Sequence, residues 1–361
     1  MKKILVLEPY FGGSHKNFLE GLRRNVEADY TMLTLPARKW KMRMQLSAQW
    51  FVEQLASFAC EERRFDVVLC STFVDVAVFR ALVGKLDGWN DAAKICLYYH
   101  ENQFAYPSRV KDPSLYHFTS INFNSALAAD SIAFNSEFNR SSFMAGCARY
   151  LKFASDMKFE FILQDIVAKS VVVSPGIEFS KIDEAARNEK STLSTIVWNH
   201  RWEHDKNPEA FFEALLGLQK KKIDFRLIVL GQSFRQSPDC FAAAEIHFKK
   251  ELIHFGFVDS YESYIEQLTK GTIVVSTSNH EFYGISIIEA VRAGCRPLLP
   301  NRLSYPELFP QEYLYEEGGL PEELERLVVA DRRLGPESSV ELTERFSWRA
   351  LTARYQAWLF S

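Results

Sequence analysis

The chain of 361 residues contains no apolar run long enough to cross a bilayer, which takes about 20 consecutive apolar residues. The apolar run at its start covers only residues 4–7 and ends at Glu8 and Pro9, too short for the core of a secretory signal peptide. We therefore expect a cytoplasmic protein without stable membrane insertion. Attachment to a membrane through an amphipathic surface stays open.

Paired cysteines and a strong charge imbalance are also missing. None of the six cysteines lies in a C-x-x-C spacing, which makes a zinc site and a disulfide framework poor interpretations and favours a reducing compartment. The net charge of −3 is unlike that of a strongly basic nucleic-acid-binding protein, although a local basic patch is compatible with it. The sequence gives no indication of an oligomeric state.

Two glycine-rich nucleotide signatures are absent as well: the P-loop and the G-x-G-x-x-G dinucleotide fingerprint. The second absence weakens an oxidoreductase interpretation. Two glycines, Gly12 and Gly13, do follow the first apolar run and allow a phosphate or sugar to approach the backbone, with an ordinary tight turn as the alternative. Gly231 ends a later apolar run and leaves room for a nucleotide to lie flat.

Apolar runs alternate with helical patterns along the whole chain, and its length indicates two domains. The alternation predicts an α/β fold with two Rossmann-like, doubly wound parallel sheets that face a cleft. Strands are predicted at residues 4–7, 30–35, 67–70, 95–99, 131–134 and 171–173, and again at 195–198, 226–230, 253–257, 272–276, 296–299 and 313–315.

The domain boundaries follow from the same pattern. Residues 1–178 form the expected first domain and residues 179–345 the expected second domain, with the polar residues 181–194 as a linker. The last segment, residues 346–361, is predicted to be a helix that returns to the first domain, because its apolar residues form one stripe. An ordinary helix of the second domain is the alternative. The stripe consists of Trp348, Leu351, Tyr355 and Trp358.

The most informative segment is EFYGISIIE at residues 281–289, which follows a predicted strand. It predicts a turn with Glu281 and then a helix whose N-terminal N–H groups and dipole attract an anion. A glutamate inside the helix can accept hydrogen bonds from a diol, so the segment suits the diphosphate and ribose of a nucleotide-sugar. An amphipathic helix with solvated glutamates is the alternative. The expected donor-binding residues are Glu281, Phe282, Tyr283, Gly284, Ile285, Ser286 and Glu289.

Two other polar clusters follow predicted strands. Arg201 and Lys206 lie on one loop, where a guanidinium can hold a diphosphate in fork geometry and an ammonium can add charge; surface charge is the alternative. His100 heads a run of polar residues after another strand, and a functional role is favoured over a structural histidine because its neighbours are also polar. This run is His100, Glu101, Asn102 and Gln103.

Taken together, these residues make the chain resemble the retaining GT-B glycosyltransferases of family GT4. The pieces that match occur in the right order over the whole chain. More narrowly, residues 9–16, 35–40 and 99–107 resemble the tRNA-queuosine mannosyltransferases, which are described as moving mannose from GDP-mannose to the cyclopentenediol of queuosine in tRNA. The GT4 pieces are Gly12-Gly13, Arg201 with Lys206, Gly256-Phe257-Val258, and Glu281 with Glu289.

The resemblance implies roles for these residues. It implies a nucleotide-sugar donor, no cofactor and no metal, since no D-x-D-like loop occurs in the expected place. Arg201, Lys206 and the helix N-terminus near Gly284 neutralise the leaving diphosphate. Glu289 binds the ribose, Glu281 binds sugar hydroxyls, and His100 lies beside the transferred sugar. The catalytic residues expected are therefore His100, Glu281, Arg201 and Lys206.

The acceptor side is expected to bind tRNA through phosphate contacts and a stacking surface. Arg38, Lys39 and Trp40, with Lys41 and Arg43, form a basic-aromatic cluster suited to both, and a solvated turn is the alternative. A lipid or polysaccharide acceptor is the main competing interpretation, and a binding module without turnover is another. The lipid interpretation requires a membrane-facing patch, for which Phe11, Trp40, Trp50 and Phe51 are candidates. The other acceptor residues expected are Ser14, His15, Glu101, Asn102 and Gln103.

Overall fold

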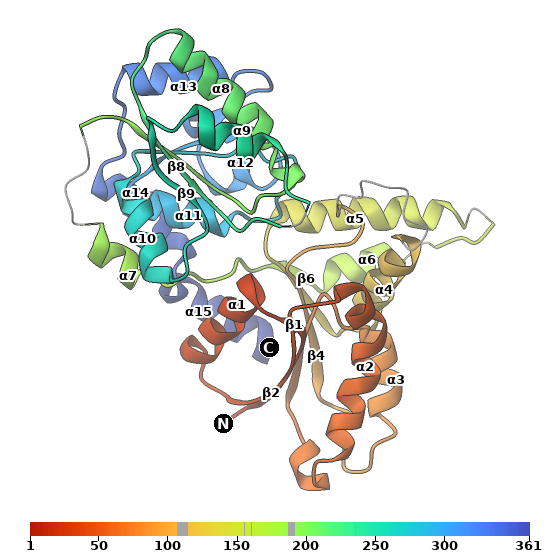
Figure 1. Ribbon diagram of the computed structural model, residues 1–361. Coiled ribbons are helices and arrows are strands. Elements are labelled where there is room, and N and C mark those ends of the chain that lie inside the picture. Colours follow the sequence, from red (N-terminus) through yellow and green to blue (C-terminus); the bar gives the residue numbers. More distant parts are fainter. Residues whose placement is uncertain (107–114, 155, 160, 187–191, 235) are drawn as a thin grey trace. The chain divides into compact units, whose positions relative to one another are not determined.

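The computed structural model describes the chain except for residues 107–114, 155, 160, 187–191 and 235. The chain divides into two compact units, described separately below (Figure 1). The first unit contains Met1–Gly176 together with Trp348–Ser361, and the second contains Ile177–Ser347.

The first unit is built on a six-stranded parallel sheet in the order β2-β1-β3-β4-β5-β6. Its strands are β1 (Lys3–Phe11), β2 (Asp29–Pro36), β3 (Val67–Ser71), β4 (Lys94–Tyr99), β5 (Ser131–Phe134) and β6 (Ser170–Val172). Its helices are α1 (Gly13–Asn25), α2 (Trp40–Ala56), α3 (Val76–Val83), α4 (Leu115–Ala128), α5 (Glu137–Lys152), α6 (Ile162–Ala168) and α15 (Trp348–Phe360), with a 3-10 turn at Cys60–Arg63.

Both faces of this sheet are covered, which is why its strands are apolar almost without interruption. Successive side chains of a strand point to opposite faces. In β1, Ile4 and Val6 pack with α1 and α15, whereas Leu5 and Leu7 pack with residues of α2, α3 and α5. Figure 1 shows α1 and α15 on one side of this sheet and α2 and α3 on the other.

The second unit contains a six-stranded parallel sheet in the order β12-β11-β10-β7-β8-β9, the order of a dinucleotide-binding fold. Its strands are β7 (Thr195–Asn199), β8 (Arg226–Leu230), β9 (Leu252–Gly256), β10 (Ile273–Val275), β11 (Arg296–Pro300) and β12 (Leu314–Tyr315). Its helices are α7 (Ser180–Ala185), α8 (Pro208–Lys220), α9 (Cys240–His247), α10 (Tyr261–Lys270), α11 (Ile285–Arg292), α12 (Tyr305–Leu308), α13 (Leu320–Val329) and α14 (Pro336–Thr343), with 3-10 turns at His204–Lys206, Gln311–Tyr313 and Glu344–Phe346.

The fold predicted from the sequence is confirmed. Each of the twelve predicted strands occurs, and β1 continues to Phe11, beyond its predicted end. The C-terminal helix packs on the first unit through the predicted stripe: Trp348, Leu351, Tyr355 and Trp358 are all buried, and Tyr355 donates a hydrogen bond to the carbonyl of Ser174 at 2.8 Å. None of the described helices has the length and apolarity needed to span a membrane.

The linker interpretation of residues 181–194 is wrong for its first part. The structure has helix α7 at Ser180–Ala185, with Ile182 fully buried in the core of the second unit. The polar residues misled the prediction because one of them, Asp183, is bound to the buried Arg292. Residues 187–191 of the predicted linker lie outside the described part of the chain.

Arg292 joins three elements of the second unit. Its guanidinium on α11 donates to Asp183 of α7 at 2.7 Å and to Glu344 at 3.0 Å, and it lies over the ring of Phe179. Its side chain is only 6% exposed, so its removal leaves two carboxylates without their cation.

We expect Arg292→Met to lower the free energy of unfolding of this unit by about 2–3 kcal/mol, below the range for a fully buried pair because both carboxylates are partly exposed. Urea unfolding followed by circular dichroism measures the loss, with Arg326→Met of the exposed pair on α13 as the matched control. Equal stability of the two variants would contradict the prediction.

Candidate active site

Each sheet has one point where the strand order reverses, and ligands of doubly wound sheets bind beyond the carboxyl ends of the strands at that point. In the first unit the reversal lies between β1 and β3, and in the second unit between β7 and β10. The predicted site residues gather at these two positions, so each unit carries its own half of the candidate residues.

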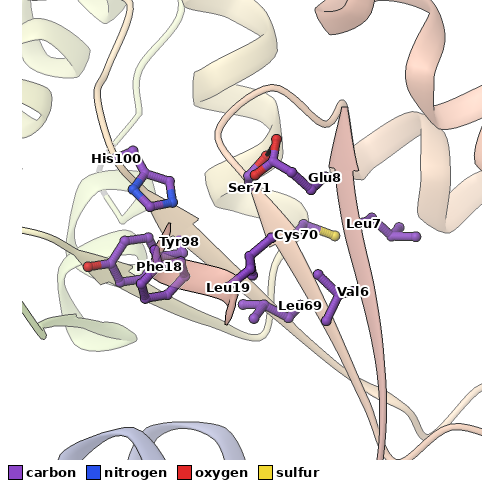
Figure 2. Close-up of a pocket in the computed structure, with 10 residues that line it drawn as sticks. All are labelled: Val6, Leu7, Glu8, Phe18, Leu19, Leu69, Cys70, Ser71, Tyr98 and His100. Carbon is purple, nitrogen blue, oxygen red and sulfur yellow. Dashed lines mark hydrogen bonds between the residues drawn. The ribbon is translucent and has the colours of Figure 1, made fainter. Parts of the chain in front are cut away.

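The centre of the first half is the buried carboxylate of Glu8, near the end of β1. It accepts hydrogen bonds from the Ser71 hydroxyl at 3.1 Å, from the Tyr10 amide at 2.8 Å and from His15 Nδ1 at 3.0 Å. Figure 2 shows Glu8 and Ser71 together at the ends of β1 and β3, with His100 at the end of β4. The sequence analysis did not single out Glu8 for the site, because it stands inside an apolar strand.

His15 and His100 stack with ring centroids 4.0 Å apart but differ in charge. Burial alone lowers the pKa of His15, but the charge of Glu8 and the hydrogen bonds to Glu8 and Glu101 outweigh burial and raise it to about 10. Burial and then the charge of His15 hold the pKa of His100 well below its usual range. At neutral pH the pair is therefore a protonated His15 beside a neutral His100.

Glu8, His15 and His100 also offer ligand atoms that lie within 4.8 Å of one another, close enough to hold a metal ion. The hydrogen-bonding pattern fits such an ion poorly. A histidine must be neutral to bind a metal, whereas His15 Nδ1 is in contact with Glu8 and Nε2 lies 3.7 Å from Glu101. The absence of a metal requirement stays a prediction.

His100 has a polar atom that the protein does not use. Its Nε2 is buried and has no hydrogen-bond partner among the described residues, whereas its backbone is fixed by Thr72 Oγ1 and Asn135. A neutral, held ring with a free nitrogen is suited to a ligand hydroxyl. This placement suits the sugar contact that the resemblance implies for His100.

Two of the predicted acceptor residues are structural. Asn102 is fully buried, and its amide donates to Asn139 Oδ1 at 2.8 Å and accepts from the Ala105 amide at 3.0 Å. Gln103 is 2% exposed, and its backbone amide donates to Asn122 Oδ1. Both residues therefore help to hold the loop after β4, and whether either contacts the acceptor stays a prediction. Pro107, at the end of this motif, lies outside the described residues.

The remaining acceptor-side residues lie around α1 and the start of α2. Ser14 is exposed in the first turn of α1. Gly13, at the helix start, has φ +51°, which only glycine adopts readily, and Gly12 has no room for a Cβ against Ala37. The ring of Trp40 packs against three other aromatic rings, those of Phe73, Tyr106 and Phe118.

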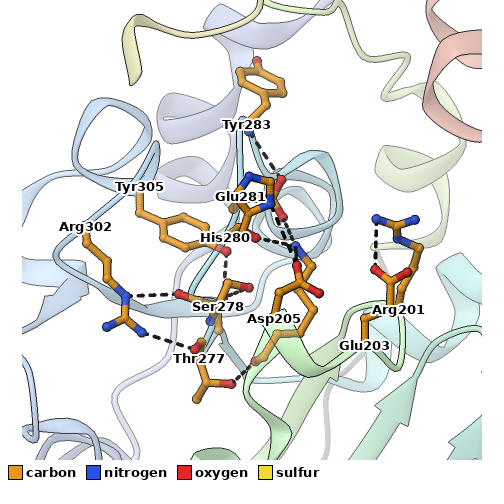
Figure 3. A network of polar contacts seen from close by, with 12 residues as sticks. Arg201, Glu203, Asp205, Thr277, Ser278, His280, Glu281, Tyr283, Arg302 and Tyr305 are labelled. Atoms are coloured by element: carbon orange, nitrogen blue, oxygen red, sulfur yellow. Dashed lines mark hydrogen bonds and ion pairs between the residues drawn. The ribbon is translucent and has the colours of Figure 1, made fainter. Parts of the chain in front are cut away.

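In the second half of the site, α11 begins at Ile285 after the left-handed Gly284, as the sequence predicted. Glu281 lies in the turn before it and contacts Lys206, whose Nζ is 3.3 Å from the Glu281 carboxylate and donates to the carbonyl of His280 at 2.6 Å (Figure 3). Burial alone raises the pKa of Glu281, but the charge of Lys206, the electrostatic influence of His200 and a hydrogen bond from the Tyr283 amide lower it overall. Glu281 is thus kept ionised.

Lys206 differs from a free surface cation. Its side chain is 7% exposed and lies between the carboxylates of Glu281 and Asp205, each 3.3 Å away. Arg201 is 58% exposed and forms an ion pair with Glu203 at 3.1 Å. The structure therefore separates the two predicted cations: Lys206 is buried between two carboxylates, and Arg201, drawn beside Glu203 in Figure 3, is exposed.

Glu289 faces α10, where it accepts hydrogen bonds from the hydroxyls of Tyr261 at 2.9 Å and Tyr264 at 3.2 Å. Burial raises the pKa of Glu289 to about 7, and the two hydroxyls only partly offset it. Asn199, at the end of β7, donates to Tyr264 and to the carbonyl of Ser286 in the first turn of α11. The carboxylate of Glu289 therefore changes its charge near neutral pH.

Other predicted residues of this half fill the turn before α11 or support it. Phe282 and Tyr283 are buried, and the Ser304 hydroxyl binds the carbonyl of Tyr283 at 2.9 Å. Gly231 is explained by backbone packing, since a Cβ would lie 1.9 Å from the carbonyl oxygen of His200. Whether a nucleotide lies on it stays a prediction.

Sequence reasoning missed the residues that hold this half together. Arg302 donates to the carbonyl of Ser278 at 3.1 Å and to Asn279 Oδ1 at 2.8 Å, so it fixes the loop after β10. Thr277 bonds to the backbone of Lys206. Tyr261, Tyr264 and Asn199 carried no local motif, because their partners are 25–87 residues away in sequence.

The pKa of Glu289 leads to a prediction. If Glu289 binds the ribose diol as a carboxylate, protonation removes an acceptor, so we expect the KM for the donor to rise as the pH falls below about 7. Glu289→Gln should have a higher donor KM at pH 8 and should lose this pH dependence. The donor KM is measured by steady-state kinetics from about pH 5.5 to about pH 8.5, in steps of about 0.5 pH units across the pKa of Glu289. A wild-type donor KM that stays flat across this range would refute the role.

The two parallel sheets, with an ionised glutamate, a buried lysine and a helix N-terminus at one switch point, define a GT-B glycosyltransferase. Residues 180–328 match the family described as glycosyl transferases group 1, and residues 3–177 match the family described as tRNA-queuosine alpha-mannosyltransferase N-terminal. A Drosophila melanogaster tRNA-queuosine alpha-mannosyltransferase is 34% identical over 323 residues, 86% of this chain and 83% of that protein. The chain belongs to the tRNA-queuosine alpha-mannosyltransferase family.

Solved structures share the fold at much lower identity. Anabaena HepE in complex with UDP has a TM-score of 0.70 at 11% identity, and the match covers 99% of each chain. Sucrose-phosphate synthase from Thermosynechococcus elongatus has a TM-score of 0.70 at 13% identity, covering 99% of this chain and 98% of that one. These likenesses support the GT-B architecture and say nothing further about substrates.

Proposed function

We propose that this glycosyltransferase transfers mannose from GDP-mannose, with retention, to the cyclopentenediol of queuosine in tRNA, in the cytoplasm and without a metal. The observation that carries the proposal is the 34% identity to the fly enzyme, which extends over 86% of the chain. The site supports it, because donor-type groups gather in one unit, and the other unit holds polar groups that include a histidine nitrogen with no partner among the described residues.

The donor is proposed to bind the second unit. The Glu289 carboxylate accepts from the ribose hydroxyls in place of Tyr261 and Tyr264, which now occupy it. The diphosphate meets the N-terminus of α11, whose dipole favours negative charge, together with Arg201 and the ammonium of Lys206. Glu281, held ionised by Lys206, accepts from hydroxyls of the sugar.

The acceptor is proposed to bind the first unit. His15 joins the carboxylates of Glu8 and Glu101, and Ser14 is exposed in the first turn of α1. The Nε2 of neutral His100, which has no partner among the described residues, is available to a hydroxyl of the transferred sugar. The chemistry is a front-face displacement. The bond from the anomeric carbon to the diphosphate breaks, the bond to the acceptor oxygen forms, and the acceptor proton passes to the leaving diphosphate.

A lipid or polysaccharide acceptor is the second candidate, and the structure weakens the patch it required. Phe51 is fully buried in the core of the first unit, and the ring of Trp40 is packed against Phe118. Phe11, Trp40 and Trp50 are each partly exposed, but the ring of Trp50 also packs against Phe51. Liposome flotation of the purified protein separates the two candidates.

The proposal is tested by incubating the protein with GDP-mannose and tRNA that carries queuosine, with tRNA that carries guanosine at the same position as the control. The expected result is an α-linked mannose on queuosine alone, assigned by nuclear magnetic resonance of the isolated nucleoside. A β-linked product would overturn retention, and transfer to the control tRNA would overturn the proposed acceptor.

A further inference from the structure

A groove between the end of β2 and helix α2 is separate from the residues that make the reaction site. It encloses about 460 Å³, within the range of about 300–1,000 Å³ that holds small organic ligands. One side is apolar and the other is basic. Its lining residues are Leu35, Arg38, Lys39, Met42, Arg43, Leu46, Ser47 and Trp50.

The apolar side of the groove is an unusual surface for a helix. The core-facing stripe of α2 consists of Met44, Ser47, Ala48, Phe51 and Leu55, all buried. Met42, Leu46 and Trp50 follow one another at four-residue spacing on a different face, where Met42 is 50% and Leu46 is 54% exposed. This second apolar stripe ends at an indole ring that is partly exposed, which is the kind of surface on which a planar base stacks.

The basic side belongs to a segment of the sequence in which all charged residues are positive. Arg38, Lys39, Lys41 and Arg43 are the charged residues between Asp29 and Glu53, although the whole chain has 46 acidic and 43 basic residues. The Nε of Arg43 is buried and has no hydrogen-bond partner among the described residues. The groove also lies at the start of α2, where the helix dipole adds positive charge.

Resting on the proposed function, we infer that this groove binds an unpaired nucleotide of the tRNA: its base stacks on Trp50 and contacts Met42 and Leu46, and its phosphates meet Arg38 and Arg43. Single-stranded RNA is bound in this way, by stacking on aromatic side chains beside a basic track. Ring contacts within the first unit connect the groove with the acceptor residues. Trp40, directly after Lys39, packs on Phe73, and Phe73 stacks on His15 with centroids 5.5 Å apart.

The aromatic residue proposed to stack on the RNA differs from the one expected in the basic-aromatic cluster. Trp40 was predicted to stack on the RNA, but its ring is packed among Phe73, Phe118 and Tyr106. The indole that lines the groove is that of Trp50, ten residues further along α2 and therefore about 15 Å away along the helix axis. The groove thus binds RNA beyond the nucleoside that is modified.

The test measures the Kd of queuosine-containing tRNA by fluorescence anisotropy at several salt concentrations, together with kcat and KM for transfer. Arg38→Gln/Arg43→Gln should weaken binding and reduce the magnitude of the slope of log K against log salt by about 1–1.5. Trp50→Ala should weaken binding about 10-fold, and Trp50→Phe should restore most of it. Each variant should raise the tRNA KM and leave kcat nearly unchanged.

Two control comparisons separate an effect of the groove from a general effect of charge. Leu46→Glu places a repelling charge on an exposed position without disturbing the core and should raise the Kd, whereas Leu46→Gln should change it little. Arg64→Gln removes an exposed cation at the opposite, amino end of β3 and should have no effect. A photocrosslink from 4-thiouridine in the tRNA to the peptide that contains Trp50 would place the base directly.

The outcomes separate this inference from the proposed function. If all groove variants bind tRNA with an unchanged Kd while the protein transfers mannose to queuosine, the groove is not an RNA site, and the proposed function still holds. If the wild-type protein neither binds nor modifies tRNA, both are overturned. Binding of anionic liposomes through the same residues, without tRNA binding, would assign the groove to a lipid surface and overturn it as an RNA site.

Discussion

Lys206→Met is expected to lower kcat for sugar transfer by about 10²–10³-fold, the range seen when one group that stabilises developing negative charge is removed. The wild-type ammonium lies 3.3 Å from Glu281 and from Asp205 and is 7% exposed. Its loss removes positive charge from the proposed diphosphate site and brings two carboxylates together without a cation. Transfer kinetics under saturating donor and acceptor measure the change.

The same variant should alter the pH profile. Burial raises the pKa of Glu281 and Lys206 is the largest opposing influence, so without Lys206 the pKa of Glu281 rises and its ionised form requires a higher pH. The residual activity of Lys206→Met should therefore increase with pH over a range where the wild type is level. Lys270→Met, which removes an exposed lysine paired with Glu266, is the control. Equal kcat values for the two variants would refute the role.

Glu8→Gln is expected to have the second largest effect, because it removes the charge that keeps His15 protonated. The pKa of His15 is raised to about 10, mainly by Glu8 against the opposing influence of burial. In the variant, burial should prevail over the single remaining partner Glu101, and the pKa of His15 should fall markedly. We expect transfer to drop by at least about 10-fold, with a loss of about 3–5 kcal/mol of stability at neutral pH.

The sign of the pH dependence makes this prediction specific. A histidine whose pKa is higher in the folded chain contributes stability that is fully present below its unfolded pKa, near 6.5, and is lost as the pH rises through about 10. Wild-type stability should therefore fall between about pH 7 and pH 10 by more than that of Glu8→Gln. Thermal unfolding across this range, with the His15 ring followed by nuclear magnetic resonance, measures both. Parallel stability curves would contradict the assignment.

The fold was predictable because its signals are local and repeated. Each strand is an apolar run covered on both faces, and the stripe on α15 predicted its return to the first unit. The helix α7 was missed because its sequence is polar: only Ile182 is fully buried, and the charge of Asp183 is balanced by Arg292, which lies 109 residues further along the chain. A single sequence gives no information on such a partner.

The site was predictable only as far as it follows from strand ends and motifs. The turn at Glu281, the start of α11 and the placement of His100 agree with the structure. The tyrosines that occupy Glu289 and the engagement of Lys206 by two carboxylates were not predicted, because they depend on which elements pack together. The contacts of Asn102 with Asn139 and of Trp40 with Phe118 were not predicted either, because these partners lie far away in the sequence.

The central claim is that this chain adds a hexose to queuosine in tRNA. The most direct measurement incubates the protein with queuosine-containing tRNA and, separately, each of a panel of GDP- and UDP-sugars, then digests the tRNA and determines the masses of its nucleosides. The account predicts that queuosine gains one hexose with GDP-mannose and that Glu289→Gln reduces the yield at limiting donor. Unmodified queuosine with every donor, in a protein that still binds a nucleotide-sugar, would contradict the account and move the acceptor to a lipid or a glycan.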